Sequence, residues 1–177
     1  MLAMSEKIDL AMRLCVPYIL MLILFLLNMI SFSTPVSTAI EIPFVVIIIY
    51  YWSVYRPSLM SPLLIFMAGI CLDFISGLPA GLSSFTFLIM HNIISQQRLF
   101  LTGQPFMVVW FGFVVVGFIT LFVQWFLFGL INFQWTPMQP VLLAIISGSL
   151  LFPIISLALN LSNRILPILP DQYSAVK

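Results

Sequence analysis

Apolar residues fill most of this chain in long runs, and the polar residues are confined to short intervals between the runs. A run of about 20 mostly apolar residues, within a range of roughly 17–25, is long enough to cross a bilayer as one helix. Six segments have this character: about 14–32, 38–55, 59–76, 80–94, 106–131 and 141–161. The pattern therefore predicts an all-α integral membrane protein, a six-transmembrane-helix bundle. The fourth segment is short and must borrow flanking residues, whereas the fifth is long enough to tilt.

Composition supports the membrane interpretation. Of the 177 residues, 63% are hydrophobic and 6% charged, whereas a soluble domain carries about 25% charged residues. The length suffices for one compact bundle, so we expect a single domain over residues 1–177, with the lipid bilayer around it. A net charge of +1 gives no reason to expect nucleic-acid binding.

The basic residues predict how the bundle is oriented. They occur before the first segment and after the sixth, and in alternate intervals between: Lys7, Arg13, Arg56, Arg98, Arg164 and Lys177. The intervals around Thr34, Leu78 and Trp135 contain no lysine or arginine. Because basic loops stay on the cytoplasmic side of a membrane, we expect both termini to be cytoplasmic.

Several residues within the segments carry further expectations. Tryptophans favour the two membrane interfaces, so Trp52 and Trp110 should lie near the inner one, and Trp125 and Trp135 near the outer one. Pro153 lies in mid-segment and should kink the sixth helix. The two cysteines, Cys15 and Cys71, lie in apolar segments and should behave as small buried side chains.

Catalytic chemistry finds little support. The chain has one histidine, His91, and no hydrolase, metalloprotease or P-loop motif. Asp73 lies about 14 residues into its segment, which places it roughly 20 Å from the cytoplasmic face. His91 belongs near that face, so the two side chains should not meet. We expect no enzymatic activity, no cofactor and no metal site.

Asp73 requires an explanation, because an acidic side chain inside a span costs about 2.5–3.5 kcal/mol on insertion scales. Three interpretations are open. The carboxyl group could bond backbone groups freed at the turn of residues 77–81 and so lock the third helix to the fourth, which we favour. It could instead grip the transmembrane helix of a partner. It could also bind a proton or a ligand.

Three glycines, Gly69, Gly77 and Gly81, recur at multiples of four residues around Asp73. Gly69 lies within the third segment, where a small residue lets another helix approach closely. Gly77 and Gly81 bracket Pro79 and are typical of turns.

The longest mixture of polar and apolar residues is the interval 96–106, expected as a cytoplasmic connection between the fourth and fifth spans. Its notable residues are Gln97, Arg98, Gln104 and Pro105. Arg98 alone could be a simple positive-inside anchor. The glutamines and the Gly-Gln-Pro-Phe turn favour a docking surface, with a shaped hairpin that binds no partner as the alternative.

These motifs resemble the bacterial rod shape-determining protein MreD family. Its central segment has an aromatic-Trp pair, an Arg-Pro turn and a G-x-x-x-D-x-x-x-G-x-x-x-G run in this order. Here the matching residues are Tyr51, Trp52, Arg56, Pro57, Gly69, Asp73, Gly77 and Gly81. The Gln-Arg and Gln-Pro-Phe pairs at residues 97–98 and 104–106 resemble a segment of proteobacterial members.

The resemblance implies a non-enzymatic scaffold of the bacterial inner membrane. Members pair with the bitopic protein MreC and belong to the cell-wall elongation machinery, with the MreB filament, the RodA glycosyltransferase and a class B penicillin-binding transpeptidase. The family has no established catalytic residues.

The family fold is similar to the S component of energy-coupling factor transporters, which supplies the alternative function: a subunit that binds a small ligand such as a vitamin. That function would need a polar cavity of a few hundred cubic ångströms. The polar residues available for it in the outer half are Ser33, Thr34, Glu41, Asp73, Ser76, Ser83, Gln124 and Asn132.

Overall fold

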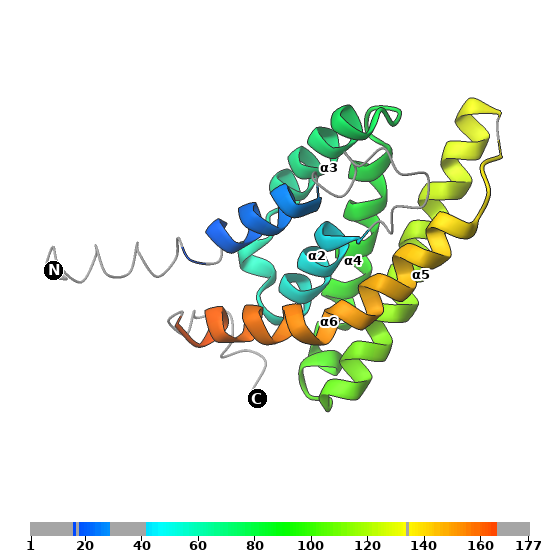
Figure 1. The fold of residues 1–177 in the computed structure, drawn as a ribbon. Helices are drawn as coiled ribbons and strands as arrows, with labels where there is room; N and C mark the ends of the chain where they lie inside the picture. Colours follow the sequence, from blue (N-terminus) through cyan, green and yellow to red (C-terminus); the bar gives the residue numbers. More distant parts are fainter. Residues whose placement is uncertain (1–15, 17, 29–41, 134, 166–177) are drawn as a thin grey trace, which may run out of the picture.

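The computed structural model describes residues 16, 18–28, 42–133 and 135–165 (Figure 1). All regular structure within these ranges is helical, which confirms the predicted fold class at this level. The helices are an N-terminal helix Tyr18–Asn28, α2 Phe44–Tyr55, a short 3₁₀ helix η1 Pro57–Leu59, α3 Pro62–Ser76, α4 Leu82–Thr102, α5 Phe106–Asn132 and α6 Gln139–Ile165.

Helix α2 forms the centre of the bundle. Every residue from Val45 to Val54 is buried, and α2 contacts α4, α5 and α6. A helix that is apolar on all sides is either buried in protein or surrounded by lipid, and α2 is buried in protein. The helix has 12 residues and is therefore about 18 Å long, shorter than the predicted segment 38–55. Ile42 and Pro43 are not helical, and residues 38–41 lie outside the described residues.

Helix α5 matches its predicted segment to within one residue, whereas α3 begins three residues late and α6 begins two residues early and ends four residues late. Helix α3 begins at Pro62, because Ser61 caps it by accepting a 3.2 Å hydrogen bond from the amide of Leu64. Helix α4 continues to Thr102, eight residues beyond the predicted end at 94. The apolar run ends there, but serine, glutamine and arginine can continue a helix. The connection expected at 96–106 is therefore a turn of residues 103–105 only.

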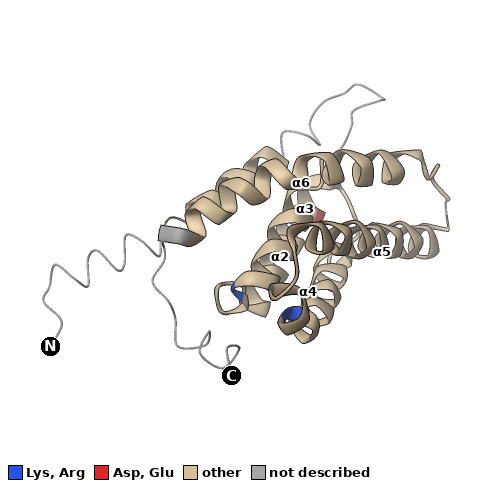
Figure 2. Ribbon diagram, turned by 90° about the horizontal axis from the view of Figure 1, so that it is seen from below, with Lys and Arg blue, Asp and Glu red and all other residues tan. Residues whose placement is uncertain are grey.

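The end of α2 meets the middle of α4 and the end of α6. Near the end of α2, Ser53 Oγ is hydrogen-bonded to His91 Nδ1 of α4 at 2.7 Å. Arg56, directly after α2, donates from Nε to Asn163 Oδ1 of α6 at 2.6 Å. We call this the basic end, defined by Arg56 and Arg98. The opposite turn end contains the turn of residues 77–81 and the connection from α5 to α6. In Figure 2 the visible basic positions lie apart from the acidic one.

Two of the described helices, α5 and α6, are long and apolar enough to cross a membrane. The most apolar 18-residue stretches of the two helices have mean hydropathies of 2.6 and 2.4. Only 22% of the first stretch and 28% of the second are buried. A core helix of a soluble protein would be mostly buried, and a signal sequence would lie near the N-terminus. The outward faces instead carry large apolar side chains such as Phe111, Leu150 and Ile154. This arrangement indicates a membrane protein.

Helix α6 contains Pro153 and changes direction along its length in Figure 1, as predicted. Proline has no N–H, so the carbonyl four residues earlier, that of Ser149, loses its helical donor. The indole Nε1 of Trp110 in α5 donates to this carbonyl at 3.0 Å. A side chain of the neighbouring helix thus replaces the bond that the proline removes.

Trp52, in the last turn of α2, is 0% exposed and belongs to the core, and its position near the inner membrane interface stays a prediction. One expectation about exposure was wrong. Cys71 is exposed, since α3 contacts α4 on one face and leaves other faces outward. Cys15 lies outside the described residues.

Candidate functional site

Asp73 lies near the end of α3 and has no exposed surface. Its Oδ2 accepts a 2.8 Å hydrogen bond from the amide of Gly81, and the amide of Ser83 donates to Oδ1 at 3.0 Å and to Oδ2 at 3.2 Å. These amides open α4, where backbone N–H groups lack helical acceptors. The bonds expected for a lock between the third and fourth helices are therefore present. In this conformation the carboxyl group offers no free face to a partner helix.

The turn between α3 and α4 depends on two glycines. Gly77 and Gly81 have φ angles of +67° and +96°, in the left-handed region that side chains with a Cβ rarely adopt. The carbonyl of Asp73 accepts hydrogen bonds from the amides of Gly77 and Leu78. The turn brings the start of α4 back beneath the Asp73 carboxyl group, and the prediction that both glycines form the turn is confirmed.

Gly69 lets α3 and α4 pack in direct backbone contact. A Cβ at this position would lie 2.5 Å from both Cα and N of Ser84. The hydroxyl of Ser84 donates to the carbonyl of Phe66 at 2.8 Å, adding a bond beside the contact. The close approach predicted for Gly69 is confirmed.

A side chain of α5 extends this network. Gln124 donates from Nε2 to the hydroxyl oxygen of Ser83 at 2.8 Å, and the backbone of Ser83 is bonded to Asp73. One continuous series of hydrogen bonds thus connects α3, α4 and α5 at the turn end.

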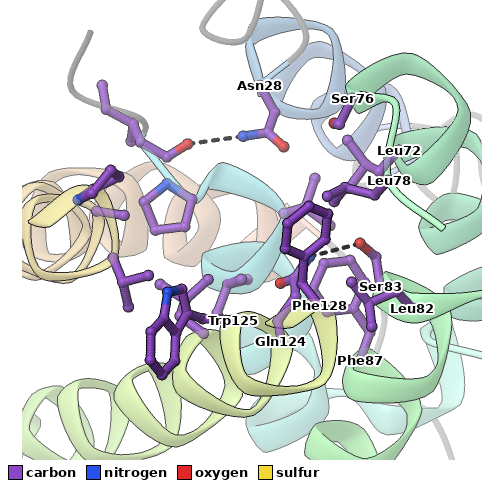
Figure 3. Close-up of a pocket in the computed structure, with 18 of the residues that line it drawn as sticks. Asn28, Leu72, Ser76, Leu78, Leu82, Ser83, Phe87, Gln124, Trp125 and Phe128 are labelled. Atoms are coloured by element: carbon purple, nitrogen blue, oxygen red, sulfur yellow. Dashed lines mark hydrogen bonds between the residues drawn. The ribbon is translucent and has the colours of Figure 1, made fainter. Parts of the chain in front are cut away.

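A cavity of about 320 Å³ lies beside this network (Figure 3). It is lined by residues from the N-terminal helix and from α2 to α6, most of them apolar. The lining includes Asn28, Ser76, Ser83, Phe87, Gln124, Trp125, Phe128, Thr136 and Ala144.

Three of the polar residues predicted for a cavity do line it: Ser76, Ser83 and Gln124. Asp73 does not line it, and Asn132 is exposed, with its amide donating to the carbonyl of Phe128 at 3.1 Å. Ser33, Thr34 and Glu41 lie outside the described residues.

Sequence reasoning missed two polar lining residues, Asn28 and Thr136. Asn28 is 4% exposed, and its amide donates to the carbonyl of Ile42 at 2.8 Å. An asparagine within the first apolar run was the available signal. Thr136 had none, because it lies in a connection whose path depends on tertiary contacts, including a 3.0 Å hydrogen bond from Trp125 Nε1 to its carbonyl.

The remaining predicted residues lie at the basic end. Arg56 is 5% exposed; burial lowers the pKa of its guanidinium, and the nearby Tyr51 acts in the opposite direction. Pro57 begins η1. Gln97 and Pro105 are exposed, and Arg98 and Gln104 are half-buried. Arg56 therefore ties helices together, whereas Gln97 and Pro105 are available at the surface.

His91 does not meet Asp73. It is bonded to Ser53, and Ser95 Oγ lies 3.5 Å from its Nε2. Within the described residues, no group of three or more His, Cys, Asp or Glu side chains could hold a metal ion.

Comparison of the chain with protein-family models, curated proteins and solved structures finds no match. The resemblance to the MreD family therefore rests on the motif residues themselves.

Proposed function

We propose that this protein is a non-enzymatic inner-membrane scaffold of the cell-wall elongation machinery. It would span the membrane six times with both termini in the cytoplasm. It would bind MreC and help couple peptidoglycan synthesis by RodA and a class B penicillin-binding transpeptidase to MreB filaments.

The observation that carries the proposal is the use of the motif residues as one structural frame. Asp73, Gly69, Gly77 and Gly81 join α3 to α4, and Arg56 joins the end of α2 to α6. A motif whose members build a frame suits a scaffold, which has no substrate to convert. It follows that partners are bound by other, outward-facing residues on this frame.

The turn end and the basic end would then have separate tasks. The single span of MreC would lie along the apolar outer surface of the bundle within the bilayer. The exposed residues around the turn of α4 and α5, including Gln97 and Pro105, would contact partners in the cytoplasm. Leu99 and Phe100 beside them are 61% and 63% exposed, which adds apolar area to this surface.

Co-purification with MreC tests the scaffold. Tagged protein isolated from its own membranes should bring MreC with it, and depletion should turn rod-shaped cells round. Gln97→Ala combined with Gln104→Ala should weaken recovery of cytoplasmic partners without changing membrane abundance. Thr120→Ala is the matched control, because its buried hydroxyl donates only to a carbonyl of its own helix. Depletion without any change of shape would contradict the scaffold.

The cavity favours a second candidate function, that of an S-component-like subunit that binds a vitamin for a transporter. Its volume of about 320 Å³ matches the few hundred cubic ångströms that a small-ligand site needs. Radiolabelled vitamins would bind the purified protein tightly in this case. Such binding together with normal cell shape on depletion would reverse the order of the two candidates.

A further inference from the structure

We propose that the cavity at the turn end binds an uncharged molecule of one or two rings that carries hydrogen-bonding groups. The proposal concerns the cavity alone and holds for a scaffold as well as for a transporter subunit. Ligand pockets in proteins are mostly apolar with a few well-placed polar groups, and this cavity has both.

The volume limits the size of the ligand. A cavity of about 320 Å³ equals the volume of about ten water molecules at roughly 30 Å³ each. One or two rings with short substituents fit this space, whereas a whole phospholipid or a transmembrane helix does not.

Polar groups line the cavity in two places. In Figure 3, Asn28 and Ser76 lie on one side of the view, and Ser83 and Gln124 on the other. The hydroxyl of Ser76 is buried and has no hydrogen-bond partner among the described residues. The amide of Asn28 donates to Ile42, which leaves its oxygen as an acceptor.

The lining selects against charge. None of the described residues of the lining is a lysine, arginine, aspartate or glutamate. A carboxylate or ammonium group would lose its hydration without a counter-charge from these residues, which is costly. Asp73, beside the cavity, has no exposed surface, and both of its oxygens accept backbone hydrogen bonds. Neutral donors and acceptors are the groups that this lining can pair.

Aromatic side chains supply the walls. Phe87, Trp125 and Phe128 line the cavity, and aromatic rings pack well against rings of a ligand. A hollow of about 310 Å³ beside α3 has apolar lining residues apart from Tyr18 and Cys71. The two cavities differ in the polar groups that line them, and we therefore assign the ligand to the cavity at the turn end.

Three pyridine derivatives of similar shape but different charge test whether the cavity prefers a neutral ligand. Nicotinamide is neutral, nicotinate has a carboxylate in place of the carboxamide and is an anion, and 1-methylnicotinamide is a cation. Saturation-transfer NMR on the full chain in detergent should show saturable binding of nicotinamide, with at least tenfold weaker binding of the two ions. Equal or stronger binding of either ion, or no saturable binding of nicotinamide, would overturn the proposal.

Two variants place the binding in the cavity. Gln124→Leu should weaken nicotinamide binding at least fivefold, whereas Asn132→Leu, an exposed amide on the same helix, should leave it unchanged. Ala144→Leu should abolish binding, because the larger side chain would fill part of the cavity. This effect does not depend on the hydrogen bonds of Gln124. If Ala144→Leu binds as well as the parent protein, nicotinamide lies elsewhere and the assignment fails. MreC recovery with Ala144→Leu separates this result from the scaffold proposal, since it should stay normal.

Discussion

Single polar side chains in this protein complete backbone hydrogen bonds at helix ends and interruptions. Asp73 accepts from the amides that open α4, Ser61 accepts at the start of α3, and Trp110 donates to a carbonyl left free by Pro153. In an apolar surrounding, each such group would otherwise be unpaired at a cost of about 1–3 kcal/mol. These three polar side chains therefore lie where the backbone has groups without helical partners.

Asp73 permits a direct test at this scale. Asp73→Asn should be tolerated better than Asp73→Leu, because the amide oxygen can still accept from Gly81 or Ser83. Leucine leaves both amides unpaired, so its loss of stability should be larger by about 1–3 kcal/mol. The measurement is membrane abundance and the thermal unfolding midpoint in detergent, with Asn132→Leu as the control. An Asn variant that is stable and bound to its partner, yet without function, would instead assign Asp73 a role in proton or ligand binding.

At the scale of the helix, close packing and a helix interruption determine how neighbours fit. Gly69 brings α3 against α4, and Pro153 is matched by a donor from α5. Both features are contacts between helices rather than properties of one helix. A substitution in one helix should therefore have an effect that depends on the residue it contacts in the neighbouring helix.

Gly69→Ala should destabilise the α3–α4 pair. The added Cβ would lie 2.5 Å from backbone atoms of Ser84, and a backbone contact cannot rotate away as a side chain can. Overpacking of this kind costs about 1–3 kcal/mol. Gly103→Ala is the control, because its nearest neighbouring atom would lie 3.9 Å away. Equal unfolding midpoints for the two variants would show that the helices do not pack this closely.

A double-mutant cycle tests the pairing of Trp110 with the proline interruption. Trp110→Phe leaves the carbonyl of Ser149 without its donor and should cost about 1–3 kcal/mol. In a Pro153→Ala background the helix supplies the donor itself, so the same change should cost at least about 1 kcal/mol less. Thermal unfolding of the four proteins gives the coupling. Additive effects would mean that the indole stabilises the protein only by packing.

For the whole molecule, the separation of the two ends agrees with a one-sided charge distribution. Arg56 and Arg98 follow or end helices that run in the same direction. The described residues of the turn end, which include the turn of residues 77–81, contain no lysine or arginine. The proposed orientation places the basic end in the cytoplasm.

Reporter fusions test this orientation and the six proposed spans. Fusions at Thr34, Leu78 and Trp135 should report a periplasmic location, and fusions at Arg98 and Lys177 a cytoplasmic one. Leu78 precedes α4 and Arg98 lies near its end, so the two fusions form an internal pair. A cytoplasmic signal at Leu78 would contradict the proposed topology.

The amino-acid pattern by itself determined the helical class, the ends of α5 and the two turn glycines, and it favoured the bonds of Asp73 over two other interpretations. These are local consequences of apolar run length, of glycine's freedom at positive φ, and of the cost of an unpaired acid among apolar residues. Three of the polar residues around the cavity were also predictable, because the outer half of the predicted bundle contains few polar residues.

The tertiary structure alone decided which apolar residues lie inside. Trp52 and Phe111 both lie in apolar runs, yet one is fully buried and the other 63% exposed. In a membrane protein, lipid-facing and core-facing residues are equally apolar, so hydropathy cannot tell them apart. The cavity also arises only when six helices meet, since its lining comes from segments as distant as Asn28 and Ala144. Hydropathy also missed the late end of α4, because the polar residues that follow its apolar run can continue a helix.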